Sequence, residues 1–103
     1  MTALSHLLKS FEELWPTSTA EDWDRVGLML GHPAGEVSKV LLSVDVTAEV
    51  VDEAIASGAQ LLLTHHPMLL RPVHELGELT AKGNLITRGV RGGLAIFAAH
   101  TNA

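Results

Sequence analysis

The amino-acid sequence predicts an α/β fold with three layers, in which a mainly parallel sheet is flanked by helices. Apolar segments at residues 39–46, 59–64 and 94–99 alternate with amphipathic segments, and this order is typical of parallel strands joined by right-handed crossovers. The apolar segments are almost uninterrupted, which is typical of strands buried on both faces. A chain of 103 residues is the size of one small domain, so we expect a single α/β domain over residues 1–103.

The N-terminal third is expected to contain one helix and one short strand. Apolar side chains recur at helical spacing over residues 3–15, and Pro16 ends the pattern. Residues 16–36 are expected to be mostly loop, with a short edge strand around Leu28 to Leu30.

The two crossover helices carry start and stop signals in the sequence. Thr47 is expected to cap the first of them, which ends before Gly58. Thr80 is expected to cap the second, which ends at Gly92 and Gly93.

Composition excludes several classes of protein. The net charge is -5 and the few basic residues form no stripe, so nucleic-acid binding is disfavoured. The chain has no cysteine, which excludes disulfides and thiolate metal sites. No apolar run approaches the ~18 residues that a membrane span needs. We therefore expect a soluble, cytoplasmic protein with no membrane partner.

Polar side chains follow each predicted central strand at its carboxyl end. Asp45 lies at the end of the first, His65 and His66 follow the second, and His100 and Asn102 follow the third. Because ligands bind outside the carboxyl ends of parallel strands, these side chains are expected at one site. Imidazole nitrogen binds zinc, iron, nickel and manganese, so His65 and His66 are candidate metal ligands.

The adjacent histidines leave two arrangements open. Successive residues of an extended strand point to opposite sides, so His65 and His66 are expected to serve two ions, or one binds while the other supports. Two ions roughly 3.5–4 Å apart are a recurring hydrolytic device. The plainer alternative is that histidines at strand ends are surface residues and that Asp45 only orients the helix at Thr47.

Other candidate residues have plainer interpretations. His6, His32 and His74 are expected to be exposed or to lie in turns. Trp15 and Trp23 are interpreted as residues of the core or of an interface, not as platforms for a ligand.

Three segments of the sequence resemble the Nif-three-like family, the GTP cyclohydrolase I type 2 homologues with a dinuclear metal centre. The segments are EDWDRVGLMLG at 21–31, LLSVDVTAEVVDEAIASGAQLLLTHHPMLL at 41–70 and AIFAAHTN at 95–102. The double histidine is the most specific of these features, and all three segments occur in order at the family's spacing.

The resemblance implies a metal centre and an oligomer. It implies a ring-shaped homohexamer of α/β domains that holds two divalent ions, which can be zinc, manganese, iron or nickel. His65 and His66 match the family's paired ligands. His100 and Asn102 match positions just before the family's ligand aspartate, and they are expected, with Asp45, at the edge of the site as supporting residues.

The resemblance also implies that the site is incomplete here. The family's aspartate would directly follow Ala103, and a further histidine and glutamate lie near the C-terminus of family members. The chain is therefore expected to be the N-terminal part of a longer protein, and to bind metal weakly and be inactive alone.

The function implied by the resemblance is that of a divalent-metal-dependent hydrolase. Two ions would activate water against a nucleotide such as GTP or a related substrate, although no residue here is assigned a catalytic role. The alternative is a non-catalytic metal-binding protein with an interaction or regulatory role. Turnover that is lost on chelation would distinguish the first from the second.

Overall fold

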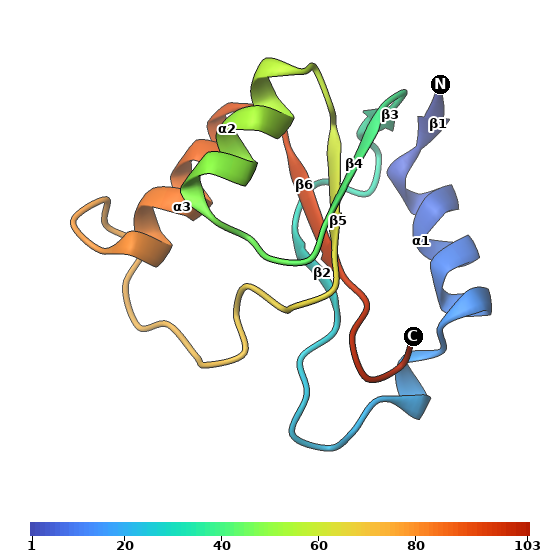
Figure 1. Ribbon diagram of the computed structural model, residues 1–103. Coiled ribbons are helices and arrows are strands. Elements are labelled where there is room, and N and C mark those ends of the chain that lie inside the picture. Colours follow the sequence, from blue (N-terminus) through green and yellow to red (C-terminus); the bar gives the residue numbers. More distant parts are fainter.

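The computed structural model describes residues 1–103, and its helices and strands follow the predicted order (Figure 1). The elements in chain order are β1 (Thr2–Ala3), α1 (Leu4–Leu14), the 3-10 helix η1 (Thr17–Thr19), β2 (Gly27–Leu30), β3 (Glu36–Val37), β4 (Val40–Ser43), α2 (Ala48–Ala56), β5 (Leu61–Thr64), α3 (Ala81–Arg91) and β6 (Ala95–Ala98). None of the helices has the length and apolar character needed to cross a bilayer.

The main sheet has four strands in the order β2-β6-β5-β4. Strands β4, β5 and β6 are parallel, as predicted, and β2 joins β6 as an antiparallel edge strand. The prediction of a short edge strand around Leu28 to Leu30 is therefore confirmed. The separate antiparallel pair of β1 and β3 was not predicted, because each has only two residues and neither shows a periodic pattern.

Helices cover both faces of the main sheet, which confirms the three-layer α/β prediction (Figure 1). On one face, α1 packs over Leu61 and Phe97, and on the other, α2 and α3 pack over Leu62 and Ile96. Neighbouring residues of β5 and β6 thus supply opposite cores, as the alternation of side chains in a strand requires. The two cores fix the position of the carboxyl ends of β5 and β6.

The predicted helix starts are present. The Thr47 hydroxyl accepts a hydrogen bond from the Val50 N–H at 3.2 Å, and the Thr80 hydroxyl accepts one from the Gly83 N–H at 3.0 Å. Each hydroxyl satisfies a backbone donor that has no partner within the first turn.

The prediction that residues 39–46 are buried on both faces is wrong. Strand β4 lies at the edge of the sheet, and Leu42 and Val44 are 69% and 57% exposed. The apolar run is real, but burial depends on which elements cover the strand. Helix α1 packs over β5 and β6 and leaves the outer part of β4 open.

A substitution at Gly31 can test how closely the segment that follows β2 packs against β6. Its φ is +132°, and a Cβ there would lie 2.6 Å from the Ala95 Cβ. Gly31→Ala is expected to lower the free energy of unfolding by about 2 kcal/mol, measured by urea denaturation, because backbone strain and overpacking add. The control is Gly58→Ala, where φ is +81° with open space around the Cβ, and a loss of only about 1 kcal/mol is expected. Equal losses would contradict the tight packing on Ala95.

Candidate metal centre

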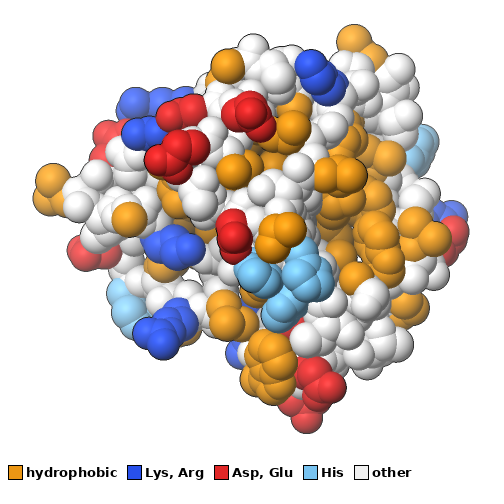
Figure 2. All heavy atoms as spheres, in the orientation of Figure 1, with side chains coloured by type: hydrophobic (Ala, Val, Ile, Leu, Met, Phe, Trp, Pro, Cys, Tyr) orange, Lys and Arg blue, Asp and Glu red, His pale blue; other side chains and the backbone are white.

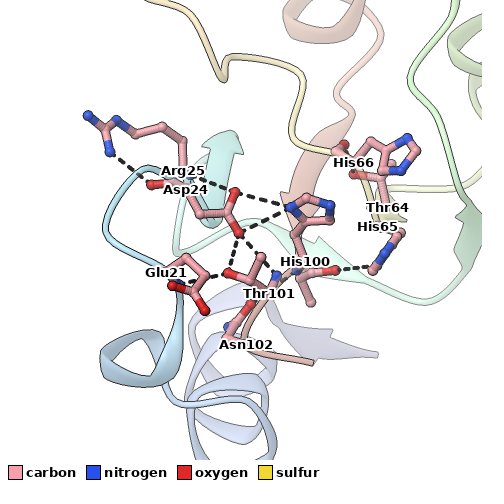
Figure 3. Close-up of polar contacts among 10 residues, drawn as sticks. Glu21, Asp24, Arg25, Thr64, His65, His66, His100, Thr101 and Asn102 are labelled. Atoms are coloured by element: carbon pink, nitrogen blue, oxygen red, sulfur yellow. Dashed lines mark hydrogen bonds and ion pairs between the residues drawn. The ribbon is translucent and has the colours of Figure 1, made fainter.

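Three histidines meet at the carboxyl edge of the sheet. Because β5 and β6 are parallel neighbours, the residues that follow Thr64 and Ala98 leave the sheet side by side (Figure 3). The ring centroids of His65 and His100 are 4.7 Å apart, and His66 lies 5.3 Å from His65 and 5.4 Å from His100. One ring nitrogen of each lies within 4.8 Å of the others. The histidine side chains form a group at the surface (Figure 2). The prediction that they meet at one edge is confirmed.

The expectation that His65 and His66 face opposite sides is wrong. Regular strand β5 ends at Thr64, and the two histidines lie in a bend. The N–H groups of both residues donate to the same neighbouring segment, to the carbonyls of Ser43 and Val44. A regular strand directs successive residues to opposite sides, so this backbone no longer alternates, and both rings join one cluster.

The Nδ1 atom of each ring is held by an oxygen. The pairs are His65 with the Ala99 carbonyl at 3.1 Å, His66 with an Asp45 carboxylate oxygen at 2.6 Å, and His100 with the two Asp24 carboxylate oxygens at 3.1 and 3.2 Å. Carbonyl and carboxylate oxygens only accept hydrogen bonds, so each Nδ1 is the donor, and in the neutral form of the ring Nε2 then carries the lone pair. This is the arrangement in which histidines bind metals.

Asp24 is a residue of the candidate site that the sequence interpretation missed. It is only 6% exposed and accepts hydrogen bonds from the Thr101 N–H at 3.0 Å, the Thr101 hydroxyl at 2.6 Å and the Arg25 N–H at 2.9 Å. Burial alone would raise the pKa of Asp24, but the hydrogen bonds from Thr101, His100 and Arg25 outweigh it and lower the pKa from 3.8 to about 2. A negative charge is thus fixed beside His100 at neutral pH.

Asn102 and Asp45 both contact the candidate ligands. The Asn102 side-chain oxygen accepts a hydrogen bond from the His100 N–H, and its amide donates to the Trp15 carbonyl. Asn102 therefore shapes the backbone that carries His100. Asp45 is bonded to His66, whereas Thr47 caps its helix with its own hydroxyl, so Asp45 is not the cap.

His100 was expected at the edge of the site as a supporting residue, and the structure also makes it a candidate ligand. Its ring nitrogen belongs to the same cluster as those of the paired histidines. The geometry therefore gives three candidate ligands, with Asp24 and Asp45 behind two of them. His6, His32 and His74 are exposed and lie outside the cluster, as predicted.

The donor set fits a divalent ion. Three imidazole nitrogens and one open position form a common catalytic zinc site, and nitrogen donors also suit iron and nickel. Tetrahedral zinc places its nitrogens roughly 3.4 Å apart, and one ring nitrogen of each histidine lies within 4.8 Å of the others. The side chain of His66 is half exposed, which leaves it room to rotate.

A substitution at Asp45 can test whether its carboxylate orients His66 for metal binding. Asp45→Asn is expected to weaken zinc binding by about 10-fold or more, because carboxylate partners orient a ligating imidazole and raise its basicity. The free energy of unfolding is expected to change by less than about 1 kcal/mol, since the pair is exposed. The measurement is calorimetric titration of zinc. The control is Asp52→Asn, whose carboxylate in α2 pairs with Arg88 in α3. Equal zinc affinities in both variants would show that Asp45 does not support the site.

The fold and the site define an α/β protein with a three-histidine cluster at the carboxyl edge of a mainly parallel sheet. Comparison with known proteins gives its family. A family model described as Duf34/NIF3 (NGG1p interacting factor 3) matches residues 2–103, and the chain belongs to this family. The resemblance seen in the sequence is confirmed.

Relatives share this part of the chain at substantial identity. The chain is 44% identical over 103 residues to a GTP cyclohydrolase 1 type 2 homolog of Streptomyces coelicolor, covering 100% of this chain and 36% of the relative. It is 42% identical over 100 residues to a protein of the same name from Mycobacterium tuberculosis, covering 97% of this chain and 26% of the relative. The chain thus spans between about a quarter and two fifths of these relatives.

Solved structures agree with the fold. A Bacillus cereus protein related to NIF3 has a TM-score of 0.90 at 37% identity, covering 98% of this chain and 28% of that one. A Staphylococcus aureus protein has a TM-score of 0.93 at 36% identity, covering 98% of this chain and 29% of that one.

Proposed function

We propose that the chain supplies a three-histidine site to a divalent-metal-dependent hydrolase that acts on a nucleotide or a related compound. The observation that carries the proposal is the shared hydrogen-bond state of His65, His66 and His100. Each ring has its Nδ1 occupied by an acceptor, which leaves Nε2 as the ligand nitrogen of the neutral ring, and one ring nitrogen of each histidine lies within 4.8 Å of the others.

The residues of this site would have two roles, as metal ligands and as hydrogen-bond partners of the ligands. His65, His66 and His100 would hold the ion, while Asp24 and Asp45 would fix two of the rings and make them better donors. A divalent ion supplies Lewis acidity, which acidifies water and polarises a carbonyl or phosphoryl oxygen.

The number and identity of the ions are part of the proposal. Three imidazoles suffice for one ion, and the proposed second ion needs ligands that residues 1–103 do not supply. Zinc, manganese, iron and nickel are the candidates. The name GTP cyclohydrolase 1 type 2 homolog, carried by relatives, supports the nucleotide part of the proposal.

Metal-dependent turnover tests the proposal. A panel of nucleotides and phosphoesters is incubated with each candidate metal and the full-length protein of which residues 1–103 are expected to be the N-terminal part. Hydrolysis is expected, lost on addition of a chelator and restored by excess metal. His100→Ala is expected to abolish turnover, and His74→Ala, in an exposed loop, to leave it intact. Turnover that survives both chelation and His100→Ala would refute a metal-dependent reaction at this site.

A non-catalytic metal-binding interaction protein is the second candidate. The exposed apolar side chains of Leu42 and Val44 favour it, because contiguous apolar surface commonly marks an interface. Metal-dependent partner binding without turnover of any compound in the panel would support this candidate over the hydrolase.

Self-association is part of the proposal, with a homohexamer as the expected assembly. The apolar residues on and beside the outer edge of β4 (Val40, Leu42 and Val44) form an exposed patch, and the mean hydropathy is +0.24. In sedimentation velocity at micromolar concentration the protein is expected to be larger than a monomer. Leu42→Asp is expected to shift it toward monomer, whereas Leu79→Asp, in a fully exposed loop position, is not. A uniform monomer before any substitution would rule out the assembly.

A further inference from the structure

One aromatic ring stands apart from the others. The chain has two phenylalanines, two tryptophans and no tyrosine. Phe11, Trp15 and Phe97 pack together, with ring centroids 5.6 and 4.9 Å apart along the series Trp15–Phe11–Phe97. Trp23 is 58% exposed instead, and its ring lies 6.0 Å from the His100 ring in an edge arrangement. The exposed indole therefore lies at the rim of the three-histidine cluster, not in the core.

The backbone on both sides of Trp23 is fixed to the segment that carries His100. The Asp24 N–H donates to the Glu21 carbonyl at 3.0 Å, which closes a turn around Trp23. The Glu21 N–H donates to the Thr101 hydroxyl at 2.9 Å, and the buried Asp24 carboxylate accepts from Thr101 and His100 (Figure 3). These hydrogen bonds fix the backbone of the turn, while the indole of Trp23 remains largely exposed to solvent.

We propose that Trp23 is a stacking platform for a planar heteroaromatic ring of the substrate, and this inference rests on the proposed function. An indole held in place offers its π-face at little entropic cost, because the backbone is already ordered. Stacking of bases on aromatic side chains tolerates any base, since every base has a π-face. The platform would place the ring of a nucleotide beside the metal centre.

The charged residues around Trp23 favour binding of the uncharged base of a nucleotide at this position over binding of its phosphate group. Glu21 and Asp22 are exposed on the same turn and would repel an anion. Arg25 extends away from the histidines in Figure 3, and its guanidinium donates to the Asp24 carbonyl at 2.8 Å. The uncharged part of a nucleotide therefore fits at Trp23, and its phosphate lies away from this turn.

Calorimetry with a matched pair of probes tests the platform. The zinc-loaded protein is titrated with adenosine 5′-monophosphate and with ribose 5-phosphate, which lacks the base. The nucleotide is expected to bind about 10-fold more tightly. Trp23→Ala is expected to remove this preference, and Trp23→Phe to keep most of it. Zinc affinity is expected to be the same in both variants, since Trp23 is not a ligand.

Fluorescence provides a readout that a merely structural role would not change. In the Trp15→Phe variant, Trp23 is the only tryptophan. Adenosine 5′-monophosphate is expected to quench its emission, and ribose 5-phosphate is expected to leave it unchanged.

The outcomes separate this inference from the proposed function. An undiminished preference for the nucleotide in Trp23→Ala, or no preference when zinc is bound, overturns the platform and leaves the metal site standing. Tighter binding of phosphocholine than of the nucleotide, lost in Trp23→Ala, overturns it in favour of a cationic ligand. Failure of zinc, manganese, iron and nickel all to bind overturns both proposals.

Discussion

His100→Ala is expected to weaken zinc binding by at least about 100-fold. Loss of a hydrogen-bond partner behind a ligating histidine costs 10–100-fold, and loss of the ligand itself should cost more. Two imidazoles would remain where a zinc site of this type uses three. The same loss is expected for His65→Ala and for His66→Ala, because one ring nitrogen of each belongs to the same cluster.

The measurement is competition for zinc between the protein and a chromophoric chelator. His74→Ala is the matched control, since it removes an exposed imidazole outside the cluster and should leave the affinity unchanged. The expectation of weak binding rested on one imidazole for each of two ions. One ring nitrogen of each of the three histidines lies within 4.8 Å of the others, so tighter binding of a single ion is expected if all three are ligands. Unchanged affinity in any of the three cluster variants would remove that histidine from the site.

Asp24→Ala is expected to lower the free energy of unfolding by about 3–4 kcal/mol. The carboxylate accepts hydrogen bonds from Thr101, Arg25 and His100, and its removal leaves donors without partners in a buried place. The measurement is urea denaturation followed by tryptophan fluorescence. Asp22→Ala is the control, because Asp22 is an exposed acid on the same turn and its loss should change stability by less than about 0.5 kcal/mol. Similar losses in the two variants would contradict the role of the buried carboxylate.

The contribution of Asp24 is also expected to depend on pH. Its pKa of about 2 in the folded chain lies below its ordinary value of 3.8, so the folded state binds the proton less readily than the unfolded state. The stabilisation is therefore complete above pH 3.8 and is lost as the pH falls through about 2. The stability difference between the parent chain and Asp24→Asn should shrink across this window. A difference that stays constant down to pH 2 would contradict the assignment.

Local patterns in the sequence were sufficient for most of the fold. The caps at Thr47 and Thr80 act within one helical turn, and the apolar runs of β5 and β6 are buried by their immediate neighbours. The same kind of run in β4 misled the burial prediction, since Leu42 depends on how far α1 extends over the sheet. That extent is a property of the assembled layers.

The site was predicted less completely because its decisive contacts are not periodic. The shared side of His65 and His66 follows from a bend after Thr64 that strand alternation does not describe. The contact between Asp24 and His100 joins residues 76 positions apart, and no spacing rule links them. Asp24 does lie in the segment 21–31 that carried the family resemblance, which was the available signal.

The clamp formed by Asp24 and Thr101 has a thermodynamic consequence for the segment between η1 and β2. Docking of this segment and the orientation of His100 depend on the same hydrogen bonds, so they are coupled equilibria. An ion that binds the oriented His100 more tightly must, by linkage, raise the equilibrium constant for docking of the segment by the same factor at saturation. Amide hydrogen exchange around Glu21 and Asp24 would then slow as the metal is added. Binding of an ion at the edge of the sheet would thus protect the amides of a loop that is distant in sequence from His65 and His66.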